Sequence, residues 1–206
     1  MKTRFEIQEQ VFQQIGKELH DNVGQLLSTS RMLIGLTERE LQNPPDTLLT
    51  ANATLGQAIN EIRSLAKSLD KEWLERFSFS ENIQTLIERI NAGKTIEVDY
   101  LQTVELPLRS DEQIILFRIV QEAIQNAVKH AAPTHMRIAV EPEENNYRIT
   151  VSDDGRGFDV NAVAKSMGLA NMQHRVQLLQ GTIQFNSIKD AGTTVAIRLP
   201  VNTNNA

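Results

Sequence analysis

The sequence contains no cysteine among its 206 residues. Disulfide frameworks, thiolate zinc sites and cysteine nucleophiles are therefore excluded, and a reducing cytoplasm would not affect the chain. Basic residues are not in excess either, because 21 Lys and Arg stand against 26 Asp and Glu, a net charge of −5. Binding nucleic acid through bulk electrostatics needs a clustered basic excess, so we expect no nucleic-acid partner.

Long apolar runs are also absent from the sequence. No stretch approaches the roughly 20 apolar residues that a membrane-spanning helix needs. The first six residues, Met1 to Glu6, lack the apolar centre of a signal peptide. We therefore expect the chain as given to be soluble and cytoplasmic.

A heptad pattern occupies the first third of the chain. Apolar and small polar residues recur at steps of three and four from residue 12 to residue 36, and a spacing of seven returns between residues 48 and 69, after Pro44-Pro45. The pattern predicts an antiparallel helical hairpin. Because a lone hairpin buries too little apolar surface, we expect two copies to pair as a homodimeric four-helix bundle.

Beyond the hairpin the pattern is that of mixed helices and strands. We expect helices at 80–92, 111–131 (with Ser110 as N-cap) and 169–179, and strands at 95–101, 136–140, 147–151, 182–186 and 194–199. Strands in pairs with helices between them predict an α+β sandwich. The expected organisation is a hairpin over residues 1–72, a sandwich domain over 73–201 and a polar tail over 202–206.

The hairpin carries one segment with chemical potential, Glu18-Leu19-His20-Asp21. His20 follows a seam position, so its imidazole should lie at the edge of the bundle and meet solvent. A carboxylate that orients one ring nitrogen leaves the other free to act as a nucleophile, and Asp21 can supply it. Gln25 lies four residues after Asp21 and is suited to positioning a water. Taken alone, His20 fits a solvated surface histidine equally well.

Two glycines flank His20 in the same predicted helix. Gly16 and Gly24 each lie one turn away from it, and a glycine inside a helix costs about 1 kcal/mol relative to alanine. We interpret them as a bare stripe that clears the approach of another domain to His20.

A second segment lies in the helix expected at 111–131. Glu122, Asn126 and His130 recur every four residues and share one face, and Lys129 follows Asn126 by three. An Asn carbonyl is a hard oxygen ligand for magnesium, and a Lys neutralises phosphate charge. By itself this stripe also fits the exposed face of an ordinary amphipathic helix.

Three glycine-containing segments follow. Asp153 ends a strand before Gly155 and Gly157, so its carboxylate could accept from an exocyclic amine while the glycines allow close approach to a planar ring. Asp-Asp-Gly is also ordinary turn chemistry. The other two segments are Gly168-Leu169, which opens a helix whose free N–H groups favour phosphate, and Gly192-Thr193, which enters the last strand.

Taken in order, these segments resemble the two-component sensor histidine kinases of the DesK/NarX-like subfamily. The hairpin looks like their dimerisation and phosphoacceptor region, and His20, Asp21 and Gln25 match its His-Asp-x-x-x-Gln pattern. The remainder looks like the ATP-binding domain shared with gyrase, Hsp90 and MutL. The resemblance covers the whole chain.

The resemblance implies a role for each matching residue. Asn126 would hold Mg²⁺ in the N-box, and Asp153 would accept from the adenine amine. The family's second glycine box often begins with glycine, whereas this sequence has Ser166 there, and the lid before it is short. The nucleotide-binding set is Glu122, Asn126, Lys129, His130, Asp153, Gly155, Gly157, Gly168, Leu169, Gly192 and Thr193.

The implied activity is autophosphorylation of His20 from Mg-ATP and transfer of the phosphoryl group to an aspartate of a response regulator. Gln25 would aid the reverse dephosphorylation of that regulator. Any membrane attachment would come through an amino-terminal sensor region outside this sequence. Two alternatives stay open: a nucleotide-gated conformational ATPase, in which Glu122 activates water, and a phosphatase-biased scaffold that binds the regulator.

Overall fold

The computed structural model describes residues 4–159 and 167–201. The chain forms two compact units, Met1–Arg76 and Phe77–Ala206. Within the described ranges, no helix is both long enough and apolar enough to cross a membrane.

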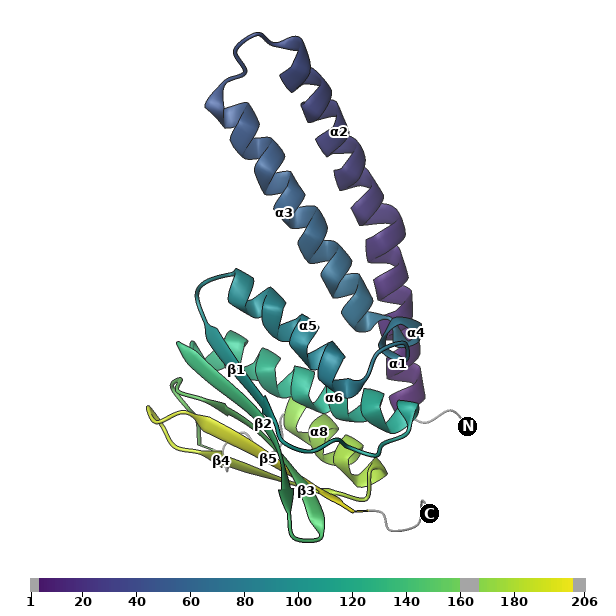
Figure 1. The fold of residues 1–206 in the computed structure, drawn as a ribbon, viewed down its shortest axis with the longest axis vertical. Helices are drawn as coiled ribbons and strands as arrows, with labels where there is room; N and C mark the ends of the chain where they lie inside the picture. Colours follow the sequence, from purple (N-terminus) through teal and green to yellow (C-terminus); the bar gives the residue numbers. More distant parts are fainter. Residues whose placement is uncertain (1–3, 160–166, 202–206) are drawn as a thin grey trace. The chain divides into compact units, whose positions relative to one another are not determined.

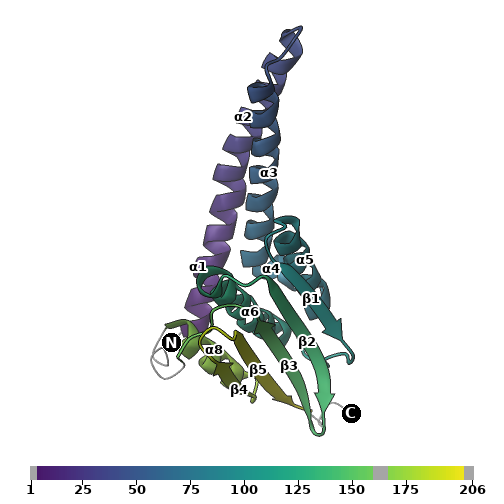
Figure 2. The same cartoon turned by 90° about the vertical axis from the view of Figure 1, so that its left-hand side faces the viewer.

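The first unit is the expected antiparallel helical hairpin, and Figure 2 shows its two arms side by side. Its first arm is nearly continuous but changes from α-helix to a short π-helix and back. Its second arm is a single long helix followed by one short turn of helix. The elements are α1 (Arg4–Glu18), the π-helix η1 (Leu19–Val23), α2 (Gly24–Glu40), α3 (Asp46–Leu69) and α4 (Lys71–Leu74).

The hairpin buries little within one chain. In α3 the buried residues are Gly56, Ile59 and Ala66. Several apolar positions of the predicted seam lie open instead: Ile15, Leu26, Leu33 and Leu36 are all at least 44% exposed. The heptad pattern therefore marks a second apolar face that the fold of the single chain leaves uncovered.

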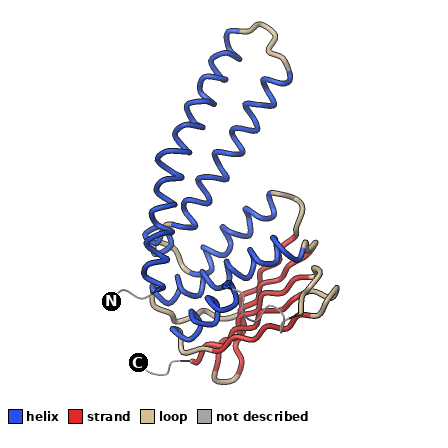
Figure 3. Tube along the Cα trace, turned by 180° about the vertical axis from the view of Figure 1, so that it is seen from behind, coloured by secondary structure: helices blue, strands red, loops and turns tan. Residues whose placement is uncertain are grey.

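The second unit is an α+β sandwich, as expected from the sequence (Figures 1 and 3). Among the described residues, the helices α5, α6 and α8 lie over one face of a five-stranded sheet whose order is β1-β2-β3-β5-β4. β1 pairs with β2 in parallel, and the other pairs are antiparallel. The elements are α5 (Phe79–Ala92), β1 (Glu97–Gln102), α6 (Ser110–Asn126), the π-helix η2 (Ala127–Ala131), β2 (His135–Glu143), β3 (Asn146–Asp153), α8 (Met167–Leu178), β4 (Thr182–Ser187) and β5 (Thr193–Pro200).

Local chemistry explains where these elements begin. Ser78 caps α5 in a capping box, because its side chain accepts from the Glu81 N–H while Glu81 accepts from the Ser78 N–H. The prediction that Ser110 caps α6 is wrong, since Ser110 is already helical and Arg109 is the N-cap. There the Arg109 N–H donates to Glu112, 2.9 Å away, so the acidic residue of the first turn sets the helix start.

The core lies between the helices and the sheet. α6 is central, with ten buried residues between Ile114 and Ile124. On the sheet, the core includes Ile138, Ile149 and Ile197, each 0% exposed. β2 and β3 run further than expected and leave only residues 144 and 145 between them, with Glu144 in the left-handed region at φ 49°.

Candidate functional site

A cavity of about 550 Å³ opens in the second unit, beside the end of α6. Its walls come from α6 with η2, from β3 and β5, from β4 and from the start of α8. Most of its surface is apolar, with a few polar groups that converge on it. The lining residues are Glu122, Ala123, Asn126, Ala127, His130, Ala131, Val151, Asp153, Gly157, Phe158, Gly168, Leu169, Met172, Phe185, Thr193 and Val195.

Most of the predicted nucleotide-binding residues meet at this cavity, although their segments are far apart in the sequence. Lys129, Gly155 and Gly192 do not line it. Lys129 is exposed on η2. Most of the predicted lid between Phe158 and Gly168, residues 160–166 with Ser166 among them, lies outside the described residues.

The apolar lining was not identified from the sequence. Phe185 on β4 and Val195 on β5 are cross-strand partners, and both line the cavity with Met172 of α8. Strand alternation indicates which residues share a face, but it does not show which face meets a cavity. These residues were therefore predicted as ordinary strand and helix positions.

Asp153 is the acidic group of the cavity wall. It is the last residue of β3 and lies opposite Thr193 of β5. Its Oδ1 accepts from the Gly155 N–H at 2.9 Å. Burial raises the pKa of its carboxyl, while the backbone hydrogen bonds from Gly155 and Thr193 act in the opposite direction. A half-buried carboxylate fixed by N–H donors is a directional acceptor for a ligand's amine.

The glycines of the loop are required by neighbouring backbone. Gly157 has φ +57°, and a Cβ there would lie 2.0 Å from the Ile188 carbonyl oxygen. Gly192 has φ +82°, and its Cβ would meet the Asp153 carbonyl oxygen at the same distance. A Cβ at Gly155 would lie 2.5 Å from the Ala131 oxygen. Glycine therefore allows the protein's own segments to pack closely around Asp153.

Glu122 and Asn126 form a polar corner of the cavity beside Gly168. A Cβ at position 168 would lie 2.7 Å from Glu122 Oε1 and 3.5 Å from Asn126 Nδ2. The absence of a side chain there keeps the corner open. Within the described residues, no three His, Cys, Asp or Glu side chains cluster as metal ligands. The corner instead fits a magnesium ion that is held mainly by phosphate oxygens and water, with one or two protein oxygens.

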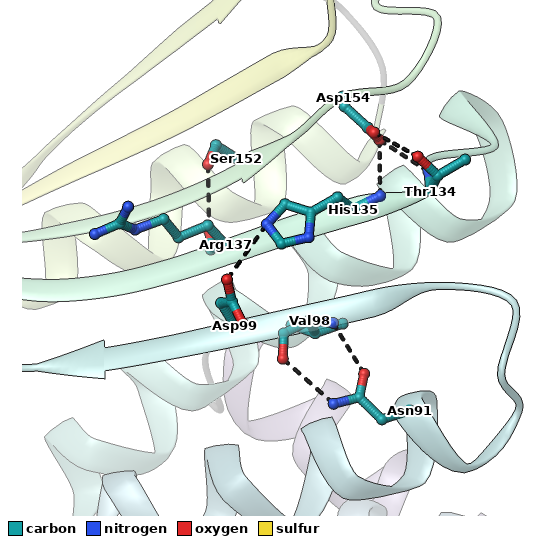
Figure 4. Close-up of polar contacts among 8 residues, drawn as sticks. All are labelled: Asn91, Val98, Asp99, Thr134, His135, Arg137, Ser152 and Asp154. Atoms are coloured by element: carbon teal, nitrogen blue, oxygen red, sulfur yellow. Dashed lines mark hydrogen bonds and ion pairs between the residues drawn. The ribbon is translucent and has the colours of Figure 1, made fainter.

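Figure 4 shows the polar contacts where the end of β3 meets the start of β2. Asp154 accepts from the backbone N–H groups of Thr134 and His135 and from the Thr134 hydroxyl. Asp153 is the last residue of β3 and Asp154 directly follows the strand, and the two adjacent carboxylates have different partners. Sequence reasoning assigned nothing to Asp154, although its place directly after Asp153 was the available signal.

Beside these contacts, β1 is tied to its own surroundings (Figure 4). The Asn91 side chain accepts from the Val98 N–H at 2.9 Å and donates to the Val98 carbonyl at 3.3 Å. Asp99 lies 3.4 Å from His135 Nε2, in an exposed pair. These bonds fix the start of β1 against α5 and β2 and lie away from the cavity lining.

The hairpin carries the second candidate site, on η1. His20 Nδ1 lies 3.0 Å from Asp21 Oδ1, with side chains 66% and 48% exposed. The Gly24 N–H reaches back five residues to the Leu19 carbonyl, which defines the π-turn, and such turns often occur at functional sites. An exposed imidazole with a carboxylate on one nitrogen has its other nitrogen open to a reactant.

Gly16 and the spacing of Gln25 differ from the expectation. Gly16 is buried, and a Cβ there would lie 3.0 Å from the Ala66 carbonyl oxygen and 3.3 Å from Leu69 Cβ. The interpretation of Gly16 as a cleared approach to His20 is therefore wrong, because it allows close packing of α1 on α3. Gln25 is exposed on α2, and the π-turn alters the one-turn spacing that was expected between it and Asp21.

Two family models match this chain. Residues 13–73 match a histidine kinase family, and residues 111–203 match the histidine kinase-, DNA gyrase B- and HSP90-like ATPases. The sensor protein VraS of Staphylococcus saprophyticus is 31% identical over 194 residues, which are 92% of this chain and 55% of the relative. The signal transduction histidine-protein kinase/phosphatase DegS of Brevibacillus brevis is 26% identical over 204 residues, 95% of this chain and 53% of the relative.

Solved structures resemble this chain in fold. The histidine kinase domain of the blue-light activated histidine kinase of Erythrobacter litoralis aligns with a TM-score of 0.56 at 16% identity, covering 86% of this chain and 94% of that one. The histidine kinase AdeS of Acinetobacter baumannii aligns at 0.51 and 16% identity, covering 91% and 98%. The chain spans about half the length of the curated relatives that it matches.

Proposed function

The chain belongs to the two-component sensor histidine kinases, and from that premise we propose that it transfers the γ-phosphoryl group of ATP to His20. The observation that carries the proposal is the meeting of Glu122, Asn126 and Asp153 around one cavity. The exposed His20–Asp21 pair on the hairpin complements it. One unit would bind the donor nucleotide, and the other would carry the acceptor.

Asp153 would recognise the adenine end of the nucleotide. Its carboxylate would accept a hydrogen bond from the exocyclic amine, while the apolar lining around Leu169 and Met172 would pack against the ring. A hydrogen bond between an amine and a charged acceptor contributes about 1.5–3 kcal/mol. This contribution selects adenine over a base that lacks the amine.

The corner formed by Glu122 and Asn126 would hold the phosphate end. The Asn126 amide oxygen is the proposed magnesium ligand, with Glu122 beside it, and Mg²⁺ supplies charge neutralisation for the phosphates. His130 lines the same wall, and Lys129 is the exposed cation nearest to it in sequence. The N–H groups at the start of α8, beside Gly168, add donors for a phosphate oxygen.

Asp21 would prepare His20 for attack. It holds the proton on Nδ1, so that the lone pair of Nε2 forms the new bond to the γ-phosphorus while the bond to the bridging β–γ oxygen breaks and ADP leaves. The imidazole then carries a positive charge, which the Asp21 carboxylate stabilises at 3.0 Å. Positioning and electrostatics account for most of such a transfer.

The proposal extends to the partners. The uncovered apolar face of the hairpin, with Leu26 and Leu33 at its centre, supports pairing of two copies. The phosphoryl group on His20 would then pass to an aspartate of a response regulator. Gln25 would position a water for the reverse reaction, and the relative DegS is described as a kinase/phosphatase.

Labelling with γ-³²P ATP tests the central step. We expect label on the protein that is lost in acid and stable in base, and that disappears in His20→Ala. Asp21→Asn should lower the rate of labelling while ATP affinity stays unchanged. Release of free phosphate with no label on the protein would contradict the kinase and favour the conformational ATPase, and Glu122→Gln should then stop that release.

The phosphatase activity has its own test. With a phosphorylated response regulator as substrate, Gln25→Ala should slow dephosphorylation and leave the labelling of His20 intact. Equal loss of both activities would contradict the assignment of Gln25. Dephosphorylation in a chain that does not label at all would favour the phosphatase-biased scaffold.

A further inference from the structure

The nucleotide cavity depends on a junction between two segments about 20 residues apart. One is the connection from η2 to β2, where Ala132 adopts a left-handed conformation at φ 47° just before Pro133. The other is the glycine loop that follows β3. The first segment follows His130 and the second follows Asp153, which both line the cavity; under the proposed function, these are its phosphate and adenine ends.

Asp154 joins the two segments. Its Oδ1 accepts from the N–H groups of Thr134 at 2.8 Å and His135 at 2.9 Å, and its Oδ2 accepts from the Thr134 hydroxyl at 2.6 Å. The Asp154 N–H in turn donates to the His135 carbonyl at 3.2 Å. Figure 4 shows the carboxylate facing these groups from the end of its strand. The hydrogen bonds hold the pKa of Asp154 below its ordinary value, with the His135 N–H as the largest cause.

A second set of contacts, between the glycine loop and Ala131, lies next to those of Asp154. The Arg156 N–H donates to the Ala131 carbonyl at 2.9 Å. Gly155 lies so close to Ala131 that a Cβ would come within 2.6 Å of its Cβ. The last turn of η2 is therefore held to the glycine loop by the two residues that directly follow Asp154.

We propose that Asp154 is a positioning residue that fixes the Asp153 carboxylate at the distance from the Glu122–Asn126 corner that a nucleotide spans. The inference rests on the proposed function, since it assigns Asp153 to the adenine amine. Asp154 has no contact with the cavity, because its side chain bonds Thr134 and His135 instead. Its effect would pass through the backbone that it shares with Asp153.

The test compares two nucleotides that differ by one amine. ATP and the triphosphate of unsubstituted purine riboside are titrated against the full chain, and the ratio of their affinities measures the bond to the amine. In the unsubstituted chain we expect ATP to bind about tenfold tighter or more. Asp154→Ala should reduce this ratio by about threefold or more, and Thr134→Val, which removes one of three hydrogen bonds, should reduce it less.

Two further variants separate positioning from general stability. Asp154→Asn keeps an oxygen that accepts both N–H groups, so the ratio should stay near that of the unsubstituted chain. Glu143→Ala removes a carboxylate that binds Arg198 at 2.6 Å, away from the cavity. It should lower the melting temperature without changing the ratio.

The outcomes distinguish the positioning role of Asp154 from the proposed function on which it rests. An unchanged ratio in a folded Asp154→Ala chain, or an equal loss of affinity for both nucleotides, would overturn the positioning role. Equal binding of both nucleotides by the unsubstituted chain would overturn the assignment of Asp153 and with it the positioning role. Failure of that chain to bind ATP would overturn the proposed function.

Discussion

The two units of this chain bury their apolar side chains to very different extents. In the second unit, α6 alone has ten buried residues and packs on a sheet whose central isoleucines are fully covered. In the hairpin, the 24 residues of α3 include three buried ones, and Leu26 is 70% exposed. The apolar core of the α+β unit is closed within one chain, whereas the hairpin leaves much of its apolar surface exposed.

The two units also carry different kinds of site. The cavity in the α+β unit needs fixed walls, and rigid packing supplies them. The proposed phosphoacceptor, His20, would have to be reached by other proteins or domains, and an exposed pair on a helix fits that need. If the proposed function holds, the hairpin would use its open apolar face to pair with a second copy and its exposed His20 to meet the nucleotide and the regulator.

The largest effect is expected from a cavity in the core of the α+β unit. Ile138→Ala should lower the free energy of unfolding by about 2–5 kcal/mol, because the side chain is fully buried on β2. Denaturant titration measures this loss. The matched substitution on the hairpin, Leu33→Ala, should cost less than about 1 kcal/mol when the chain is dilute. Equal losses would contradict the difference in burial.

The open face of the hairpin should matter for association. Leu26→Asp combined with Leu33→Asp should raise the dissociation constant of a homodimer by at least about tenfold, because two charges would have to be buried. Sedimentation over a concentration series measures it. Ile188→Asp, at a residue 71% exposed in the α+β unit, is the control and should leave association unchanged. A monomeric unsubstituted chain would contradict the dimer.

Asp153 should illustrate a conflict between stability and binding. Asp153→Asn should weaken ATP binding by about 10- to 100-fold, because a charged acceptor is lost. The same variant should be more stable without nucleotide at pH 7, since burial raises the pKa of the Asp153 carboxyl and its ionised form opposes folding. The stabilising contribution of the protonated form is complete below the unfolded pKa and is lost as the pH rises through the raised value. Calorimetry with and without ATP measures both.

The smallest effect concerns pH and separates two adjacent carboxylates. The folded pKa of Asp154 lies below its ordinary value of 3.8, so its stabilising contribution is present above that pH and is lost as the pH falls through the folded value. Asp154→Ala should therefore be less stable than the unsubstituted chain at pH 7, and the gap should close below about pH 4. The difference in stability between Asp153→Asn and the unsubstituted chain should also disappear below about pH 4. At pH 7, however, the Asp153→Asn variant should be the more stable of the two. Parallel curves for the two variants would contradict the assigned directions.

Much of the fold follows from local patterns. Heptad spacing predicted the hairpin, and alternation with turn residues predicted five strands and three helices at nearly their observed bounds. The errors have local causes. Arg109 rather than Ser110 is the N-cap of α6, and β2 and β3 continue until only residues 144 and 145 are left in the turn between them. The two π-turns were not predicted, since an i→i+5 bond adds one residue without changing the apolar pattern on either side.

The sequence by itself determined which segments could carry chemistry, namely His20 with its neighbour Asp21, the stripe at Glu122 and Asn126, and the glycine segments. Only the tertiary structure decided how residues distant in the chain are used. It packs Gly16 against Ala66, leaves Lys129 exposed away from the cavity lining, and turns Asp154 to the backbone of Thr134, 20 residues earlier. The reason is physical: periodicity depends on neighbours along the chain, whereas a close approach or the hydrogen bonds of a carboxylate depend on the segment that packs against it.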